Sequence, residues 1–562
     1  MQRFQLTLSI LLLFTLFRQN AQAQTEYDAQ RYSEVTHGGT ARSQAMAGAM
    51  TAVGADFGNL NINPAGFGLF TRSQLQITPA LQFFNTDSYF LGANTSQFNS
   101  NFSIGSLGLV LQSDKGGKSL SSFTFAFGYN TLHQHRRHMV ASGFNAHNSI
   151  TNYFAGLADG RRPDNLSKNL NSAQEYDAFD LAAMAYNTGY LDASNQQDTF
   201  IVAMIDNYGN PNNGQYFGAF NYGNIQQTVE RIEKGRTNEW GISFAGNFDD
   251  RFHLGATIGI VDVEYSMTYE HKEEDTRNLY NVNSIDRMKL GSILFKEDLN
   301  QSGIGINLTV GGIYQPTDNL RFGLMLKTPS IISMTDTYFN GMEIRGDNGE
   351  FIATGSASNR NTFEYTLYTP AQANIGASLI LGKKFILGLD GGLMSYKSAS
   401  YSSSSAGADQ GYFRQLNQII SNAFATSYNL RVGAEFRVTD LIFLRGGFGY
   451  YSTPYGSQEN TFRDLGNANT TVSGVPAQTL STDRMVYSGG IGFKGKSFFF
   501  DATLMLQNQT DKLRLYSANY VPQFGVKENY SVNANVSPEV EMKRVWTRVS
   551  FTIGVMFGGG KD

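Results

Sequence analysis

Alternation of apolar and polar residues is the feature that most constrains this chain, because successive side chains of a strand point to opposite faces. In Ser122–Asn130 (SFTFAFGYN) every second residue is aromatic, and the residues between them are small or polar. The same two-residue period recurs in Tyr428–Val438 and again in Val545–Phe557. The pattern therefore predicts many strands that each have one apolar and one polar face.

A membrane barrel and a soluble sandwich both show this alternation of apolar and polar residues. Strand length and the style of the connections distinguish the two fold classes. The alternating stretches run about 10 residues or more, as tilted strands must to cross a membrane. Tight turns, such as Asp114–Lys118 and Thr439–Asp440, are separated by long polar stretches. Short turns at one end and long loops at the other are typical of barrels. We predict an all-β membrane protein: an antiparallel transmembrane β-barrel of about 14 strands.

The predicted barrel covers residues 73–557, followed by a short tail at 558–562. Its first two strand windows, 73–84 and 101–113, leave 85–100 as a loop. The composition agrees with a barrel, since the chain has 42 Phe, 29 Tyr and 59 Gly but only 11 Pro.

The start of the chain predicts export. A short basic start, the apolar run Phe4–Phe17 and the small-residue site Ala21-Gln22-Ala23 make residues 1–23 a signal peptide, cleaved before Gln24. The run is shorter than the roughly 20 residues of a membrane helix. The chain has no cysteine, which excludes disulfides and thiolate metal sites. Its formal net charge of −4 predicts no nucleic-acid partner.

Residues 24–72, ahead of the first strand, are crowded with small residues. Such a segment cannot build a core of its own, but it can fill a barrel that is too wide for wall side chains to fill. Within it, Asn63 has the position of an N-cap and Pro64 that of a first helical residue. We expect a plug in the lumen, with a short helix that turns the chain toward the first strand.

This segment resembles the N-terminal hatch of the FadL/TodX outer-membrane transporters. The resemblance rests on Gly39–Arg42, Ala45–Ala49, Ala55-Asp56 and above all Asn63-Pro64-Ala65, which matches the Asn-Pro-Ala motif of that hatch. Weaker matches follow in chain order at Thr369-Pro370, Arg445–Tyr450 and Asp483–Phe493.

The resemblance implies a barrel with an N-terminal hatch in a Gram-negative outer membrane, surrounded by lipid and lipopolysaccharide. Its expected ligand is hydrophobic or amphipathic, such as a long-chain fatty acid or an aromatic hydrocarbon. Extracellular loops would capture the ligand, which then reaches a site near the hatch and leaves through a gap in the wall. We place the transport gate at Asn63, Pro64, Ala65 and Gly66. No cofactor is implied.

One connection, residues 132–236, is too long for a simple loop and follows the third strand, whereas the resemblance places ligand capture in later loops. Aromatic residues at three- and four-residue spacing, including Phe179 and Tyr186, predict a helix there. The apolar run that contains Phe200 and Met204 follows. This extracellular, partly helical insertion is expected either to cap the barrel rim or to present these four residues to a hydrophobic ligand. The alternative is that the insertion binds a protein partner.

Two groups of polar residues are candidates for chemistry. Asp390, Arg431, Glu435 and Arg445 are predicted on inward faces of neighbouring strands, where they form a structural salt-bridge network or bind a ligand carboxylate in the lumen. His133 and His135 share a face at strand spacing, so that with His138 they suggest a metal site. The alternative is a basic cluster that contacts lipid phosphates at the outer rim.

Motifs of the common enzyme classes are missing from the sequence: it has no Gly-x-Ser-x-Gly elbow, no His-Glu-x-x-His and no P-loop. We therefore expect a transporter rather than an enzyme. Two alternatives stay open: a barrel that serves a secretion system by shuttling surface proteins, and a general porin.

Overall fold

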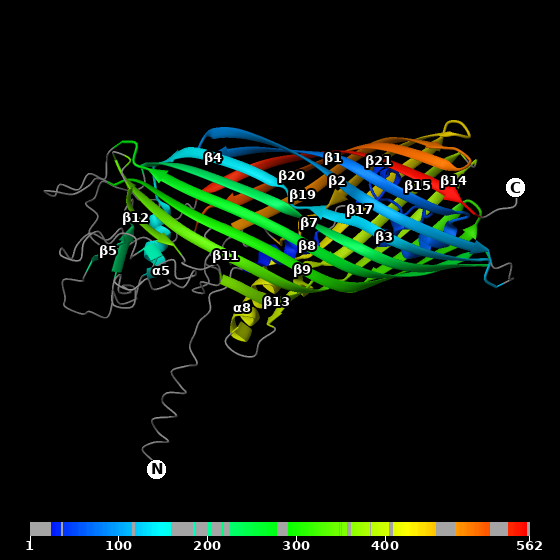
Figure 1. Ribbon diagram of the computed structural model, residues 1–562, viewed down its shortest axis with the longest axis horizontal. Helices are drawn as coiled ribbons and strands as arrows, with labels where there is room; N and C mark the ends of the chain where they lie inside the picture. The colour runs from blue at the N-terminus through cyan, green and yellow to red at the C-terminus, as the bar shows by residue number, and fades with distance from the viewer. Residues whose placement is uncertain are drawn as a thin grey trace, which may run out of the picture.

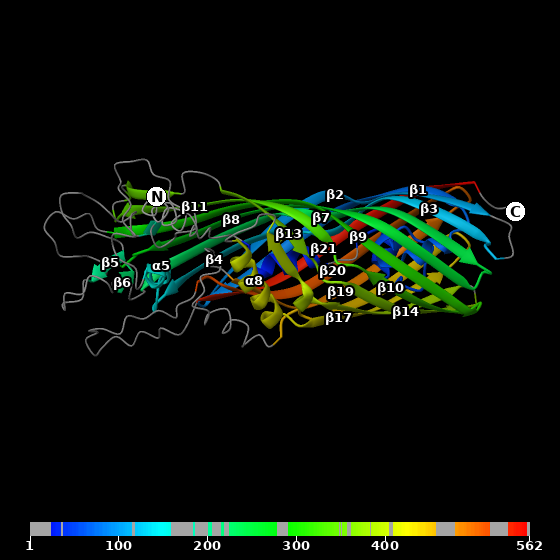
Figure 2. The ribbon, with the colours of Figure 1, turned by 90° about the horizontal axis from the view of Figure 1, so that it is seen from below.

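The computed structural model describes residues 24–34, 38–114, 119–158, 184–185, 201–204, 215–218, 224–277, 290–347, 349, 351–356, 361–382, 384–403, 409–456, 478–516 and 538–558. They form an elongated barrel with N-terminal residues inside it, as Figures 1 and 2 show from two directions. The expected signal peptide, and the tail beyond Gly558, lie outside the described residues.

Fourteen antiparallel wall strands close the barrel, which confirms the predicted fold class. Several wall strands consist of two consecutive segments, and β21 pairs with β1 to complete the ring. In order around the barrel they are β1 (Ser73–Phe90), β2 (Ala93–Asp114), β3 (Ser122–Gln134) with β4 (Arg137–Asn145), β7 (Ile225–Phe248), β8 (Phe252–Glu274), β9 (Leu290–Thr317), β10 (Leu320–Lys327) with β11 (Ile331–Gly346), β14 (Gln372–Leu381) with β13 (Asn361–Tyr368), β15 (Phe385–Ser395) with β16 (Ser400–Ser403), β17 (Thr426–Arg437), β18 (Ile442–Tyr451), β19 (Gln478–Lys494), β20 (Phe498–Arg514) and β21 (Glu539–Phe557).

An apolar band surrounds the outside of the barrel next to the short turns. Outward side chains such as Phe244, Ile258, Ile306 and Leu430 are exposed there. The aromatic residues Tyr129, Trp240, Tyr428, Tyr450 and Tyr487 lie where the band ends toward the long loops. An exposed apolar band with an aromatic border fits a bilayer. No helix in the described part of the chain is long and apolar enough to cross a membrane.

The first hairpin departs from the prediction. Residues 85–100 are not a loop, because β1 and β2 continue to a tight turn at Leu91 and Gly92, whose φ angles are 47° and 83°. The strand signal is weak there because most of the outward residues are polar, with Tyr89 and Phe98 as exceptions. β4 and β7 likewise extend into the predicted insertion, which leaves 146–224 between these wall strands.

The remaining elements lie mainly toward the long-loop end (Figure 1). Within 146–224 the structure describes α5 (Ile150–Ala158), β5 (Ile201–Met204) and β6 (Gln215–Gly218), and β12 (Phe351–Ser356) forms a hairpin with β11. After β16, α8 (Asp409–Ala423) turns Phe413, Leu416 and Ile420 inward and leaves its polar face exposed. The short turn η2 (Tyr396–Ser398) precedes β16.

The described residues of the N-terminal segment, 24–34 and 38–72, lie inside the barrel. They contain α2 (Glu26–Ser33), α3 (Ala41–Ala45), α4 (Asn59–Ile62) and the 3-10 helix η1 (Pro64–Leu69). Residues 38–72 pack against the wall near the short turns, whereas α2 lies closer to the middle of the lumen (Figure 2).

Candidate functional site

Glycines on the inner wall let the N-terminal segment approach closely. A Cβ atom built on Gly433 would lie 2.7 Å from Met46 O, and one on Gly388 would lie 2.6 Å from Ala49 O. Gly447 faces the backbone of Met46 and Ala47 in the same way. These strand glycines have ordinary backbone angles, so close approach of another backbone is the reason that only glycine fits. The wall and the N-terminal segment are therefore complementary in shape.

The predicted cap at Asn63 is confirmed, although the helix that follows is 3-10. Asn63 Oδ1 accepts a hydrogen bond from Ala65 N (3.1 Å), and Pro64 is the first helical residue. Asn63 Nδ2 also donates to Thr51 O (2.6 Å) and to Gly312 O of β9 (3.3 Å). Asn63 therefore links two parts of the N-terminal segment to the wall, with Ala65 and Gly66 buried beside it.

The predicted inward charges are brought together, and they hold the N-terminal segment. Asp390 accepts hydrogen bonds from Thr51 N (2.9 Å) and Thr51 Oγ1 (2.7 Å), and Arg431 donates to Gly48 O (3.1 Å). Glu435 forms ion pairs with Arg42 of the segment and with Arg445. Their contact with a ligand stays a prediction.

The four predicted capture residues are not placed by the structure. Phe179, Tyr186 and Phe200 lie outside the described residues, and Met204 ends β5, for which only the backbone is described. Their role also stays a prediction.

The three histidines do not converge on one point. A bulge at Leu132 shifts the register of β3 on β7 and turns His133 and His135 inward, with ring centroids 4.7 Å apart. His138 faces outward, and its Nε2 lies 2.7 Å from Glu230 Oε1. Among the described residues no group of three or more His, Asp or Glu side chains is arranged to hold a metal ion.

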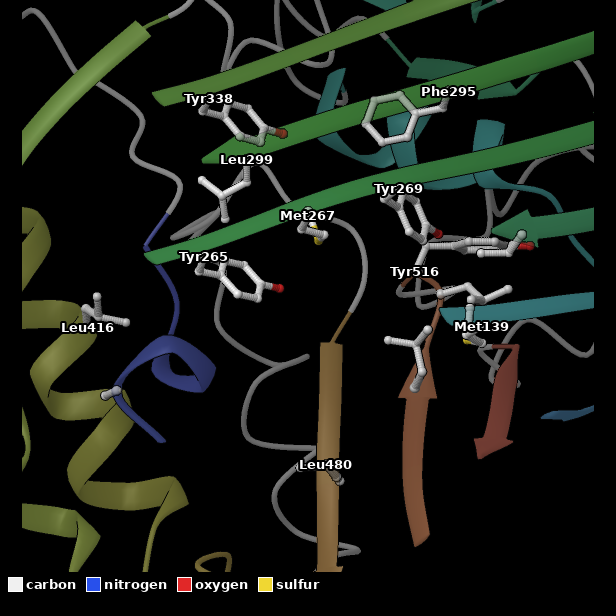
Figure 3. Close-up of a cluster of buried hydrophobic side chains, with 14 of the residues drawn as sticks. Met139, Tyr265, Met267, Tyr269, Phe295, Leu299, Tyr338, Leu416, Leu480 and Tyr516 are labelled. Atoms are coloured by element: carbon white, nitrogen blue, oxygen red, sulfur yellow. The ribbon is translucent and has the colours of Figure 1, made fainter. Parts of the chain in front are cut away.

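A large apolar cluster lies in the half of the lumen toward the long loops, next to buried polar residues such as Glu297 and Asp336. Figure 3 shows Tyr265, Met267 and Tyr269 on one side of β8, with Leu416 of α8 and Leu480 of β19 in the same buried cluster. Inward residues of β9 and β11, including Leu299 and Met334, belong to it as well. Apolar side chains therefore line much of this part of the lumen, whereas a water-filled barrel has a polar interior.

Sequence reasoning missed this apolar cluster, although β8 carries a signal for it. Its apolar residues face outward as far as Ile260 and inward from Val261 to Tyr269. The apolar face therefore changes sides within one strand. The change marks the end of the apolar outer band and the beginning of the apolar lumen.

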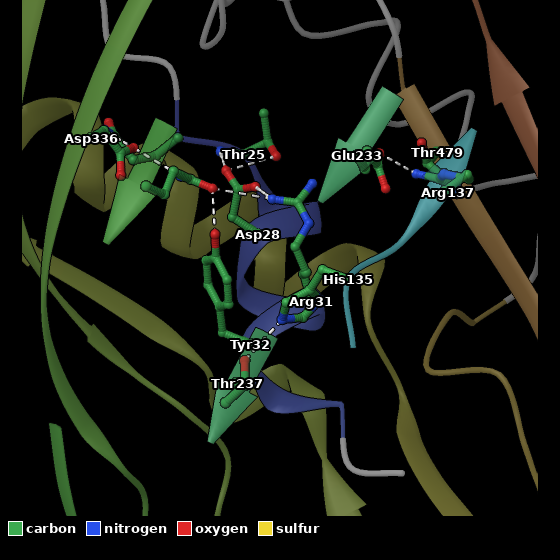
Figure 4. Close-up of polar contacts among 12 residues, drawn as sticks. Thr25, Asp28, Arg31, Tyr32, His135, Arg137, Glu233, Thr237, Asp336 and Thr479 are labelled. Carbon is green, nitrogen blue, oxygen red and sulfur yellow. Dashed lines mark hydrogen bonds and ion pairs between the residues drawn. The ribbon is translucent and has the colours of Figure 1, made fainter. Parts of the chain in front are cut away.

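Charged residues surround α2 in the middle of the lumen (Figure 4). Asp28 pairs with Arg31 on the helix, and Gln24 Nε2 donates to Asp336 Oδ2 (2.9 Å) on β11. Opposite them Arg137 pairs with Glu233 and with Asp511.

At the end of α2, Glu34 pairs with Arg484 of β19. Burial is the largest single influence on the Glu34 carboxyl and would raise its pKa, but the positive charges of Arg484, Arg544 and Arg137 and the nearby His133 together lower that pKa. Ion pairs and hydrogen bonds thus hold residues 24–34 in place.

A gap in the wall opens between β2 and the third strand. β2 pairs with β3 only through Ser106–Asp114, so 93–105 and 131–145 face each other without a strand ladder. Side-chain contacts join the two edges at each end of the gap: Thr131 Oγ1 donates to Ile104 O (3.3 Å), and Thr95 Oγ1 donates to Val140 O.

A cavity of about 760 Å³ begins at this gap and extends along β7, β8 and β9. Phe102, Ile104 and Trp240 line it at the level of the outer aromatic border, and Arg136, Lys234 and Arg236 line it beyond that border. Unpaired strand edges are tolerated at membrane depth where they line a cavity. The sequence gives no sign of this gap, because it results from strand register.

Comparison with known proteins rests on structure. No protein-family model matches the chain, and no curated protein matches it significantly. The P. putida toluene transporter TodX superimposes with a TM-score of 0.50 at 10% identity, over 93% of this chain and 100% of that chain. A Pseudomonas aeruginosa FadL homologue gives a TM-score of 0.47 at 11% identity, over 94% and 100% of the two chains. The likeness to TodX, at this low identity, concerns the fold. The chain has the fold of the FadL/TodX barrels.

Proposed function

We propose that the protein transports hydrophobic or amphipathic small molecules across the outer membrane of a Gram-negative bacterium. The observation that carries this proposal is the apolar cluster in the lumen, which includes Met267, Leu299 and Met334. An apolar solute gains from such contacts, whereas ions and sugars lose their hydration there. Methionine side chains adapt to ligands of different shape. These features favour a hydrophobic ligand over the general porin.

The wall gap supports a lateral route for the ligand. Residues 38–72 fill the barrel near the short turns, where they block a straight path along the axis. The cavity between β2 and β3 offers an apolar surface at the border of the outer band. TodX, which shares the fold, is named as a toluene transporter. Aromatic hydrocarbons and long-chain fatty acids are therefore the ligand classes to test first.

Reconstitution of the purified protein into liposomes tests the proposal. We expect it to accelerate entry of radiolabelled toluene or palmitate over protein-free liposomes, with little passage of glucose. Rapid glucose passage with high ion conductance would instead identify a porin. Recovery of a stoichiometric protein partner from native membranes, with no small-molecule transport, would favour the secretion role.

Asn63 provides a test of the gate. Asn63→Ala together with Pro64→Gly removes the cap and the hydrogen bonds to Thr51 O and Gly312 O. The lost cap alone costs the short helix roughly 0.5–2 kcal/mol. We expect the uptake rate to change by several-fold while the closed barrel, held by its own hydrogen bonds, survives.

Radiolabelled palmitate or toluene uptake measures this effect, and heat-modifiable gel mobility reports whether the barrel is folded. Asn422→Ala, on the exposed face of α8, is the matched control. Unchanged uptake of both probes, or an unfolded barrel, would show that Asn63 and Pro64 are not part of a gate.

A further inference from the structure

Arg548 of β21 is a buried arginine without a counter-ion in the described part of the chain. Its exposed fraction is 1%, and its Nε and Nη2 atoms have no hydrogen-bond partner among the described residues. Every other buried arginine of the described residues forms an ion pair with a carboxylate. These pairs are Arg31–Asp28, Arg137–Glu233, Arg231–Glu233, Arg431–Asp390 and Arg484–Glu34.

The side chain lies between residues 38–72 and the upper lumen. The next inward residue toward the short turns is Ser550, whose Oγ donates to Gln44 Oε1 of the N-terminal segment (2.8 Å). The next inward residue toward the long loops is Trp546, which stacks on Phe84 with ring centroids 5.6 Å apart. A ligand that moves from the upper lumen toward the N-terminal segment passes this level.

The guanidinium also lies at the foot of the wall gap. β2 has a bulge at Gly105, between Ile104 and Ser106 in its register with β1. A Cβ atom at Gly105 would collide with Arg548 Nη2, so the guanidinium occupies the space that the absent side chain leaves. Ser103 and Ile104, just before Gly105, line the wall cavity. Arg548 is therefore adjacent to the lining of that cavity.

A buried cation without a partner is costly, and an anionic group that fits its donors removes the cost. A carboxylate accepts two parallel hydrogen bonds from a guanidinium. The cross-strand neighbours of Arg548 are Gln82 on β1 and Met505 on β20, and Phe84 and Trp546 lie one step toward the long loops. The apolar side chains of Met505, Phe84 and Trp546 suit an attached hydrocarbon chain better than a hydrated inorganic ion. We propose that Arg548 binds the carboxylate of a transported amphiphile, so that the protein prefers carboxylates to neutral molecules of equal chain length. This inference rests on the proposed transport function and specifies its ligand class.

Tryptophan fluorescence measures the preference directly, because the chain has only two tryptophans. Trp240 lines the wall cavity and Trp546 is the inward neighbour of Arg548. Dodecanoate and dodecanol are titrated into detergent-solubilised protein. We expect Arg548→Met to weaken dodecanoate binding about tenfold or more, since a hydrogen bond to a charged group is lost. Dodecanol affinity should change less than about twofold, and Arg548→Lys should keep part of the preference because it keeps the charge.

Arg236→Gln is the charge-matched control, because Arg236 lines the cavity beside Arg548 but pairs with Glu264 at the exposed outer side of that cavity. Its preference for dodecanoate should equal that of the unmodified protein. An equal loss of affinity for dodecanoate and dodecanol in Arg548→Met, or no loss of affinity for either ligand, would overturn the proposal. Full displacement of dodecanoate by inorganic phosphate at constant ionic strength would also overturn it, since the site would then be an inorganic-anion site. If the unmodified protein binds neither probe, the proposed transport function itself fails.

Discussion

Gly447→Val is expected to displace the N-terminal segment from the barrel wall, whereas Gly446→Val, one residue away on β18, is expected to leave it in place. Gly447 faces the backbone of Met46 and Ala47, which has no room for a side chain. A Cβ atom on Gly446 would meet only Ser488 O, at 3.9 Å. Valine favours strands in both positions, so the barrel should form in both variants.

Because the chain has no cysteine, a single Ser43→Cys substitution can show whether the N-terminal segment is packed against the barrel wall. Ser43 is fully buried in the N-terminal segment. We expect maleimide to label this cysteine about tenfold or more faster in Gly447→Val than in Gly446→Val, as local opening exposes it. Equal labelling rates in two folded variants would contradict the tight packing of the segment against the wall.

Met267→Asp is expected to abolish most transport of hydrophobic molecules. Met267 is buried in the apolar cluster of the lumen, between Tyr265 and Tyr269 on the inner face of β8, and its cross-strand neighbours are Leu299 and Glu233. A carboxylate there adds a second acidic group beside Glu233 and keeps water in the lumen, and both effects disfavour an apolar ligand. We expect the rate of palmitate and toluene uptake to fall about tenfold or more, which corresponds to roughly 1.4 kcal/mol in the barrier.

Thr268→Asp is the matched control for this prediction. Thr268 is the next residue of β8 and is exposed on the outer face. Uptake should remain within about twofold of the unmodified protein, because an exposed charge outside the apolar band is easily hydrated. If both variants fold and transport equally, the apolar lumen is not the path of the ligand.

The alternating pattern determined a large part of this fold without tertiary information. In Tyr428–Val438 and Val545–Phe557 the period of two identifies strands, and the tight turn at Thr439-Asp440 identifies one end of the barrel. The cap at Asn63 is equally local, since it depends on two neighbouring residues and their intrinsic backbone preferences. Local rules of this kind operate over a few residues, and a single sequence displays them directly.

The tertiary structure decided which residues meet across the lumen. Thr51 and Asp390 are separated by 339 residues and form hydrogen bonds because the closed ring places β15 beside the N-terminal segment. The bulges at Gly105 and Leu132 shift strand register by one residue, which exchanges inward and outward faces and opens the wall beside them. Alternation shows which side chains share a face. It does not show which face turns inward, or that Arg548 alone among the buried arginines of the described chain lacks a carboxylate, because both depend on contacts between distant strands.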